Sequence, residues 1–287
     1  MFWIWGAGTR PLFFGNKKMR VALGLEYRGT RYCGWQTQLT GCAVQDQLER
    51  ALEKFLGAPV ATICAGRTDA GVHAMAQVIH LETDIARDES AWLRGANSFL
   101  ADDIRVVWAK HVEPDFHARF SAMSRTYRYL LLNDPVDSAA FNGLVGWFHG
   151  PLDTASMQEA ATLLLGQHDF SAYRAAECQA RSPVKMVFGA SVEPLGCRGS
   201  AGSWNGLIVF TFRANAFLHH MVRNLVGELV YVGAGRRSLA EFCEVFAGCD
   251  RTRAAPTFAP DGLYLCDIEY DALFGLPPNR RRHPFDI

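Results

Sequence analysis

Residues 59–81 read P-V-A-T-I-C-A-G-R-T-D-A-G-V-H-A-M-A-Q-V-I-H-L, and this stretch decides how the first half of the chain folds. Pro59 to Cys64 is apolar and β-branched, and Met75 to Leu81 is apolar again, so each segment predicts a strand. The loop between them, Ala65 to Ala74, is rich in glycine and polar residues. A short loop held between two packed strands presents its side chains rigidly, and catalytic groups concentrate in such loops.

One carboxylate, that of Asp69, stands in this loop between Gly66 and Gly71. Glycine adopts positive φ or admits another chain close to its backbone, so the loop offers room for a flat ligand. Arg67 precedes the acid by two residues, and His73, a candidate substrate contact, follows it by four. Asp69 is therefore a candidate catalytic acid. The alternative is an Asx-turn, in which Asp69 only caps its own loop.

The bulk composition bounds the class of protein. The chain has 287 residues, enough for one large domain or two ordinary ones, and 49% of them are hydrophobic, enough for a core. Its formal net charge is zero, so only the distribution of charge could favour a nucleic acid. We find no apolar run of the roughly 20 residues that a membrane span needs, and we expect no membrane association.

Eight cysteines are scattered along the chain, and none forms a C-x-x-C pair. We interpret them as buried free thiols of a cytoplasmic protein rather than as a disulfide framework or a zinc site. The adjacent pair His219 and His220 lacks the usual spacing of metal ligands, so we expect no metal.

The apolar pattern predicts two similar mixed α/β halves. We expect an N-terminal α+β domain over 19–116 that carries the Asp69 loop, and a C-terminal α+β domain over 117–275. Residues 1–18 read as an extension expected to be disordered, and 276–287 as a basic tail. The first half runs β-α-β-β-α-β, near the split βαβ pattern. The fold class predicted is α+β, with a largely antiparallel sheet flanked by helices and the active-site cleft between the halves.

Periodicity also places individual elements. The strands expected in addition to the two above are Arg20–Tyr27, Ile104–Val112, Arg125–Leu132, Met186–Val192, Leu207–Ala214 and Gly262–Tyr270. The helices expected are Val44–Phe55 closed by Gly57, Ser90–Leu100, Thr154–Leu165, Phe217–Val232, and one that begins with a Ser238–Glu241 capping box and ends near Gly248.

Cations and aromatic rings gather in three segments, 17–31, 117–128 and 172–185. Cations for phosphates, mixed with rings for bases, are typical of RNA recognition. A single such segment is more often a solvated face, but three together favour RNA. Arg119, Arg125 and Arg181 within them are candidate substrate contacts.

Arg223 stands beside the apolar stripe of its predicted helix. A guanidinium in that position requires an acidic or phosphate partner, because an unpaired buried charge is very unfavourable. The alternative is a surface arginine that extends over the helix.

Five segments together resemble a known family: C-A-G-R-T-D-A-G-V-H-A, D-F-H-A-R-F-S-A, R-T-Y-R-Y, N-A-F-L-H-H-M-V-R-N and D-G-L-Y-L. The chain resembles the tRNA pseudouridine synthases of the TruA type, which isomerise uridine at positions 38, 39 and 40 of the anticodon stem-loop. The resemblance runs in order from about Arg20 to about Tyr270. It departs at Asp261, where the family pattern has glutamate.

The resemblance implies roles for individual residues. Asp69 matches the nucleophilic aspartate, Arg223 the arginine that pairs with it, and Tyr127 the tyrosine that contacts the target uracil. Arg67 matches the loop arginine near the flipped nucleotide, and Leu265 an apolar residue of the uracil pocket. The family acts on tRNA as a homodimer, without cofactor or metal.

The chemistry explains these residue types. The reaction breaks N1–C1′, rotates the base and joins C5 to C1′, so it requires a charged carboxylate, which a neighbouring guanidinium favours. The base must first leave its stack, at a cost of a few kcal/mol. Asp69 attacking C1′, attacking C6, or removing a sugar proton all remain open.

Two other functions compete with this one. A catalytically silent RNA-binding module would keep the arginine and aromatic clusters but has no need of Asp69 and Arg223. A hydrolase or phosphotransferase with an aspartate nucleophile requires a second carboxylate or a metal nearby, and the next acids along the chain are Glu82 and Asp84.

Overall fold

The computed structural model describes residues 18–195 and 206–278. Our expectations for the N-terminal extension, for most of the Gly196–Gly206 turn and for nearly all of the basic tail lie outside these residues. The strands are β1 (Met19–Tyr27), β2 (Ile63–Cys64), β3 (His73–Thr83), β4 (Ile104–Val112), β5 (Ala122–Asn133), β6 (Gly146–Phe148), β7 (Gly166–Asp169), β8 (Val184–Leu195), β9 (Gly206–Ala214) and β10 (Leu263–Tyr270). The helices are α1 (Val44–Leu56), α2 (Glu89–Asn97), α3 (Thr154–Thr162), α4 (Met221–Gly233) and α5 (Leu239–Gly248).

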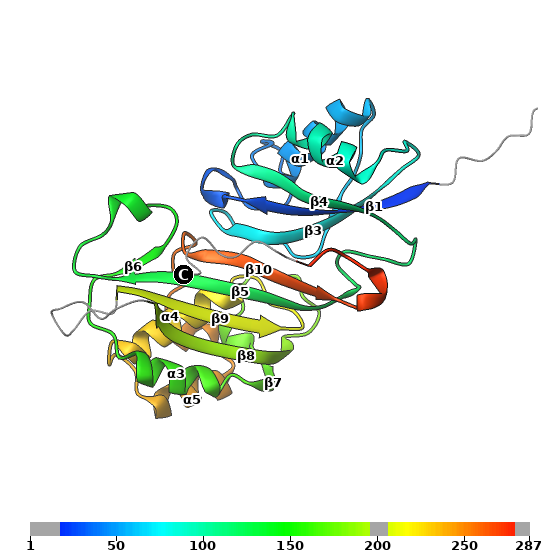
Figure 1. The fold of residues 1–287 in the computed structure, drawn as a ribbon. Helices are drawn as coiled ribbons and strands as arrows, with labels where there is room; N and C mark the ends of the chain where they lie inside the picture. The colour runs from blue at the N-terminus through cyan, green and yellow to red at the C-terminus, as the bar shows by residue number, and fades with distance from the viewer. Residues whose placement is uncertain (1–17, 196–205, 279–287) are drawn as a thin grey trace, which may run out of the picture.

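One mixed sheet runs through both halves of the chain, in the order β4-β1-β3-β10-β5-β9-β8-β7. Its pairings are antiparallel except between β3 and β10 and between β5 and the short β6. Helices α1 and α2 lie on the first-half strands, whereas α3, α4 and α5 lie against β5, β9 and β8 (Figure 1). The predicted α+β class with a largely antiparallel sheet is confirmed. The domain boundary after residue 116 falls between β4 and β5 and remains a prediction.

Local signals explain the helices that were predicted well. In α1, the Asp46 carboxylate accepts from the Ala43 N–H at 3.0 Å and caps the first turn. Gly57, with φ of 74°, ends the helix in the left-handed conformation. The predicted capping box of Ser238 and Glu241 opens α5. These contacts lie within a few residues, so the sequence alone reveals them.

Two short strands and several boundaries differ from expectation; for example, α2 ends at Asn97 rather than Leu100, and α3 at Thr162 rather than Leu165. The strand predicted from Pro59 to Cys64 is confined to β2, because the N–H of Thr62 donates to the Glu49 carboxylate of α1 at 2.8 Å instead of joining a strand. The strands β6 and β7 were missed, since three or four residues are too few to establish a period.

Helix α4 begins at Met221 rather than at the predicted Phe217. His220 has φ of 61°, in the left-handed region, and a right-handed helix cannot run through it. His219 therefore precedes the helix, whereas a helix from Phe217 would have placed it one turn before Arg223 on the same face.

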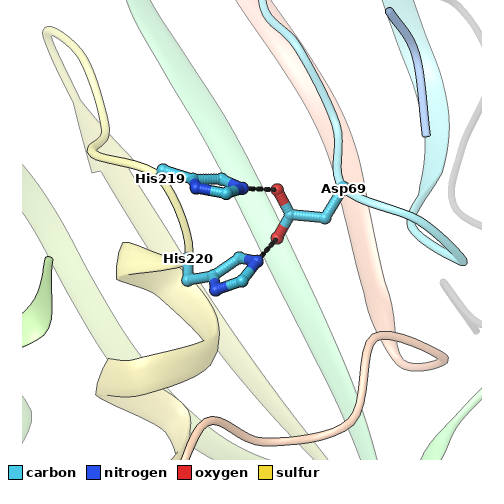
Figure 2. Close-up of side chains that lie close together, drawn as sticks. All are labelled: Asp69, His219 and His220. Atoms are coloured by element: carbon cyan, nitrogen blue, oxygen red, sulfur yellow. Dashed lines mark ion pairs between the residues drawn. The ribbon is translucent and has the colours of Figure 1, made fainter. Parts of the chain in front are cut away.

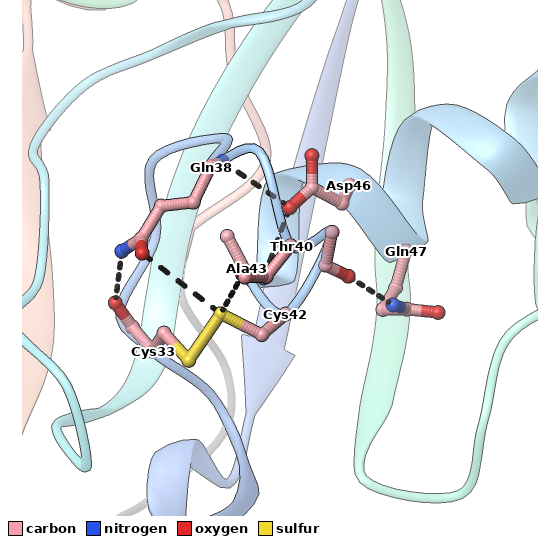
Figure 3. The surroundings of a disulfide bond; sticks show 8 residues. Cys33, Gln38, Thr40, Cys42, Ala43, Asp46 and Gln47 are labelled. Atoms are coloured by element: carbon pink, nitrogen blue, oxygen red, sulfur yellow. Dashed lines mark hydrogen bonds between the residues drawn. A yellow bond between two sulfur atoms is a disulfide. The ribbon is translucent and has the colours of Figure 1, made fainter.

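A disulfide corrects the prediction of free thiols. Cys33 and Cys42 are bonded across the loop that leads from β1 to α1 (Figure 3). The turn between them brings the two residues together, and the Cys33 N–H donates to the Cys42 carbonyl at 3.2 Å. Cys243 and Cys249 are free but exposed rather than buried.

The largest buried apolar cluster contains side chains from both halves, including Trp35 and Trp92 of the first and Phe210 and Phe242 of the second. The two halves therefore share one core along the strands β3, β10 and β5. Within the described residues, none of the helices has the length and apolar character needed to cross a bilayer.

Candidate active site

The loop that carries Asp69 runs from β2 to β3 and is fastened by backbone hydrogen bonds. The N–H of Trp35 donates to the carbonyl of Thr68 at 3.0 Å, and the N–H of Gly71 donates to the carbonyl of Tyr32 at 3.2 Å. Both partners follow β1: Tyr32 comes immediately before the Cys33–Cys42 disulfide loop, and Trp35 lies within it. The residues before and after Asp69 are thus anchored to a separate segment, so the carboxylate projects from a fixed backbone.

Glycines allow this close approach. Gly71, singled out in the sequence, has φ of 80°, a conformation that favours glycine. Gly34 was not singled out, yet a Cβ there would lie 2.8 Å from the Thr68 carbonyl oxygen, and its φ is 96°. Gly66 has no positive φ, and a Cβ there would meet the Tyr127 hydroxyl at an ordinary 3.7 Å.

Asp69 is paired with Arg223, which lies 154 residues away in the chain. The guanidinium NH1 is 3.2 Å from Oδ2 of Asp69, and the Nε–H donates to the carbonyl of Phe258 at 2.8 Å. The side chain of Asp69 is only 19% exposed, and that of Arg223 only 14%. The pair thus places a positive charge directly beside the carboxylate in a partly buried site. The loop of the first half therefore meets helix α4 of the second at a charge pair.

Two histidines that sequence reasoning considered only as metal ligands also face Asp69 (Figure 2). Nε2 of His219 lies 3.4 Å from Oδ1, and Nε2 of His220 lies 3.5 Å from Oδ2. Burial lowers the pKa of His220 below its usual value, although the charge of Asp69 opposes this. The neutral ring of His220 is therefore favoured at neutral pH. The only signal in the sequence was the position of the pair, immediately before α4.

The same three side chains bear on metal binding. One ligand atom each from Asp69, His219 and His220 lies within 4.8 Å of the others. The spacing of His219 and His220 was therefore not sufficient to exclude a metal site, because the left-handed backbone of His220 lets the adjacent histidines reach one carboxylate. However, Arg223 already holds Oδ2, and a divalent cation would face that positive charge at close range. We interpret the cluster as a carboxylate surrounded by donors.

Tyr127 and Leu265 lie opposite each other on β5 and β10, which places them on one face of the sheet. The Tyr127 ring is 8% exposed and packs edge-on against Phe217, with ring centroids 5.1 Å apart. Burial and the nearby charge of Asp69 raise the pKa of the Tyr127 phenol, so it remains protonated. Leu265 is fully buried beside it and also pairs with Ala74 of β3.

Three of the predicted arginine contacts are exposed: Arg67 on the Asp69 loop, Arg119 before β5, and Arg181 before β8. The Arg119 guanidinium lies 5.6 Å from the ring centroid of Phe120, which is 76% exposed. A cation beside an uncovered ring suits a nucleotide, with its phosphate and its base.

Arg125 and His73, also predicted to contact substrate, are instead buried and occupied by protein. The Arg125 guanidinium donates to four backbone carbonyls, those of Ala65, Arg119, Ala122 and Asn215. His73 is 1% exposed, and its Nδ1 accepts from the N–H of Gly29.

The second ring nitrogen of His73, Nε2, donates to the Asp261 carbonyl at 2.9 Å. The ring also stacks on Tyr264, with centroids 4.4 Å apart. His73 and Arg125 therefore tie loops of the two halves together, and neither presents a free polar atom to a ligand.

Comparisons with known proteins agree with this geometry. A family model described as tRNA pseudouridine synthase matches residues 25–121 and 160–271, which include Asp69, both histidines and Arg223. Three curated relatives bear the name tRNA pseudouridine synthase A. That of Methylobacillus flagellatus is 52% identical over 92% of this chain and 98% of its own. That of Thiobacillus denitrificans is 52% identical over 93% and 99%, and that of Herminiimonas arsenicoxydans 54% over 90% and 92%.

Proposed function

This chain belongs to the tRNA pseudouridine synthase family, and we propose that it isomerises uridine to pseudouridine at positions 38, 39 and 40 of the anticodon stem-loop, with Asp69 as nucleophile. The observation that carries the proposal is the Asp69–Arg223 pair, formed across the two halves at 3.2 Å. The guanidinium lies against the carboxylate in a partly buried site and offsets the negative charge that a carboxylate nucleophile carries.

The reaction consumes no second reagent, because the same base is detached and reattached. The target uridine first leaves its stack, and the enzyme recognises it as a flipped base. We assign Tyr127 to receive the uracil ring, Leu265 to support it, and Arg67 to fill the space that the base vacates. Asp69 then attacks C1′ or C6, or removes a sugar proton; each of these routes uses the same charged carboxylate.

The competing functions account for less of the site. A silent RNA-binding module leaves a charge pair flanked by two histidines without purpose. A hydrolase with an aspartate nucleophile would need a second carboxylate or a metal. Among the described residues, the group of potential metal ligands at the site holds one carboxylate, that of Asp69, together with the rings of His219 and His220.

We predict that Asp69→Asn abolishes pseudouridine formation while tRNA binding persists, because only the nucleophilic carboxylate is removed. Tritium release from tRNA labelled at C5 of uridine measures the reaction, and filter binding measures affinity. Asp84→Asn, which removes an exposed acid just after β3, is the matched control and should remain active. An active Asp69→Asn enzyme would contradict the assignment.

The modified positions require a separate test. Pseudouridine mapping of tRNA from cells that lack this protein should show loss at 38, 39 and 40, and unchanged modification at those positions would refute the substrate assignment. We also place the enzyme in the cytoplasm, the compartment in which bacterial tRNA is found. Fractionation of cells for the native protein tests this placement, and recovery in the membrane or periplasm would overturn it.

A further inference from the structure

The backbone of His220 is unusual. Its φ of 61° is one of only two positive values at non-glycine residues in the described part of the chain, the other being 52° at Cys249. The left-handed region is unfavourable for a residue that carries a Cβ. Such conformations persist where surrounding contacts impose them, and they cluster at functional sites. His220 therefore requires an explanation beyond helix formation.

Contacts on both sides impose this turn. The carbonyl of His219 accepts from the N–H of Ala175 at 3.1 Å, and the N–H of His219 donates to Sγ of Cys178 at 3.4 Å. The carbonyl of His220 accepts from the Asn224 N–H at 2.9 Å, the first bond of α4. The imidazole of His220 makes no capping hydrogen bond to the helix. The side chain is thus not needed for the end of the helix and is free to act elsewhere.

The turn directs the two consecutive histidines toward one carboxylate. Their ring centroids are 4.0 Å apart, and their Nε2 atoms face different oxygens of Asp69 (Figure 2). Oδ2 is shared by His220 at 3.5 Å and Arg223 at 3.2 Å. In an extended or helical chain, successive side chains diverge, so the left-handed residue is what makes this convergence possible.

We propose that His220 is a positioning residue for the reaction: its imidazole, with Nε2 3.5 Å from Oδ2 of Asp69, holds that oxygen in the orientation that attack requires. The proposal rests on the proposed function, because it assumes that Asp69 reacts. Arg223 supplies charge, whereas the imidazole supplies direction. Small misplacements of a reacting group reduce rates strongly, so a second donor on the same oxygen has a kinetic effect out of proportion to its strength.

Substitution by glycine separates the imidazole from the backbone. His220→Gly removes the side chain and also the Cβ that disfavours the left-handed turn. Cys249→Gly, at the C-cap of α5, relieves the same conformation where no contact with Asp69 exists. We expect both variants to melt at or above the wild-type temperature. Under single turnover with saturating tRNA, only His220→Gly should lose rate, by at least about tenfold, with tRNA affinity unchanged.

Rescue of the rate by free imidazole distinguishes a positioning role of His220 from a merely structural one. The His220 side chain is 29% exposed, so free imidazole can enter the space that glycine leaves. Added imidazole should restore part of the rate of His220→Gly and leave Cys249→Gly unaffected. A wild-type rate in His220→Gly would overturn the proposal, as would a lost rate that imidazole does not restore. Asp69→Asn in the same assay tests the proposed function separately from the role of His220. An active Asp69→Asn enzyme would refute the proposed function, whatever the result for His220→Gly.

Discussion

At the scale of single residues, Arg223 makes two directional contacts at once. Its Nε–H donates to the Phe258 carbonyl and its NH1 faces Oδ2 of Asp69. The first contact fixes the plane of the guanidinium, and the second uses that plane to hold the carboxylate. A lysine ammonium is a point charge on a flexible stem and has no such plane. The site therefore depends on the shape of the cation as well as on its charge.

We predict that Arg223→Lys retains the fold but reduces the single-turnover rate, by about tenfold to a hundredfold, because Asp69 loses its fixed partner. Arg223→Ala should also lower the free energy of unfolding, by about 1–3 kcal/mol, since it leaves a partly buried carboxylate without its cation. Urea denaturation and the tritium assay measure the two effects.

The surface pair of Arg253 and Glu244, 3.8 Å apart and mostly exposed, is the control for these variants. Arg253→Ala should change stability by less than about 1 kcal/mol. Wild-type rate and stability in Arg223→Ala would mean that the charge pair has no part in catalysis.

At the scale of elements, strand β3 connects the two halves. It pairs with β1 in the first half and with β10 of the second, and its first residue is His73. Burial lowers the pKa of His73 to about 4. His80, further along the same strand, also has its pKa lowered to about 4 by burial, and its Nδ1 accepts from the N–H of Ala118. Both contacts use neutral rings.

We predict that acid weakens the fold through these two rings. In the unfolded chain a histidine binds its proton near pH 6.5, whereas in the folded chain these two remain neutral to about pH 4. Between these values the unfolded chain binds more protons, so the free energy of unfolding falls as the pH falls. Above pH 6.5 the contribution is complete, and for His73 it is at most about 3 kcal/mol.

Urea titrations between pH 4.5 and 7.5 check this dependence. His73→Gln should flatten the slope by about one proton. An identical slope in His73→Gln and wild type would show that His73 titrates alike in both states.

At the scale of the whole molecule, positive and negative charges are equal in number but unevenly distributed. Burial raises the pKa of the Cys64 thiol, and the charges of Arg67 and Arg119 both oppose this, so each of the two guanidiniums lies near that thiol. One stands on the Asp69 loop and the other precedes the strand of Tyr127. We expect both arginines to contact phosphates of the RNA near the proposed nucleophile, although the net charge of the whole chain is zero.

We predict that tRNA affinity falls steeply with salt, because phosphate contacts release counterions. Arg67→Ala and Arg119→Ala should each reduce the slope of log affinity against log salt by roughly 0.7 to 0.9. Lys54→Ala, an exposed cation on α1, is the control and should leave the slope unchanged. Fluorescence titrations at several salt concentrations measure this slope. A wild-type affinity that does not change with salt would exclude these arginines as an RNA surface.

We also predict that the chain acts as a homodimer, with tRNA bound across both copies, as the family resemblance implies. Sedimentation velocity at micromolar concentration should give about twice the monomer mass. Mixing inactive Asp69→Asn with wild type should then form heterodimers that retain part of the activity. A monomer at every concentration that supports catalysis would contradict the prediction.

The sequence by itself determined the elements whose signals are local. Glycines around Asp69, the Gly57 end of α1 and the capping box of α5 are all visible there, because each acts within a few residues. The α+β class followed from the same periodicities. The family resemblance also linked Asp69 to Arg223, but as an inference from matched motifs and not from any contact.

The tertiary structure alone decided which distant groups meet and which are buried. It placed His219 and His220 against Asp69, because a left-handed residue, invisible in the sequence, delays the start of the helix to Met221. It closed Cys33 onto Cys42, and it enclosed His73 and Arg125 among backbone groups that occupy their polar atoms. Burial and convergence depend on how separate segments pack, and no window of neighbouring residues contains that information.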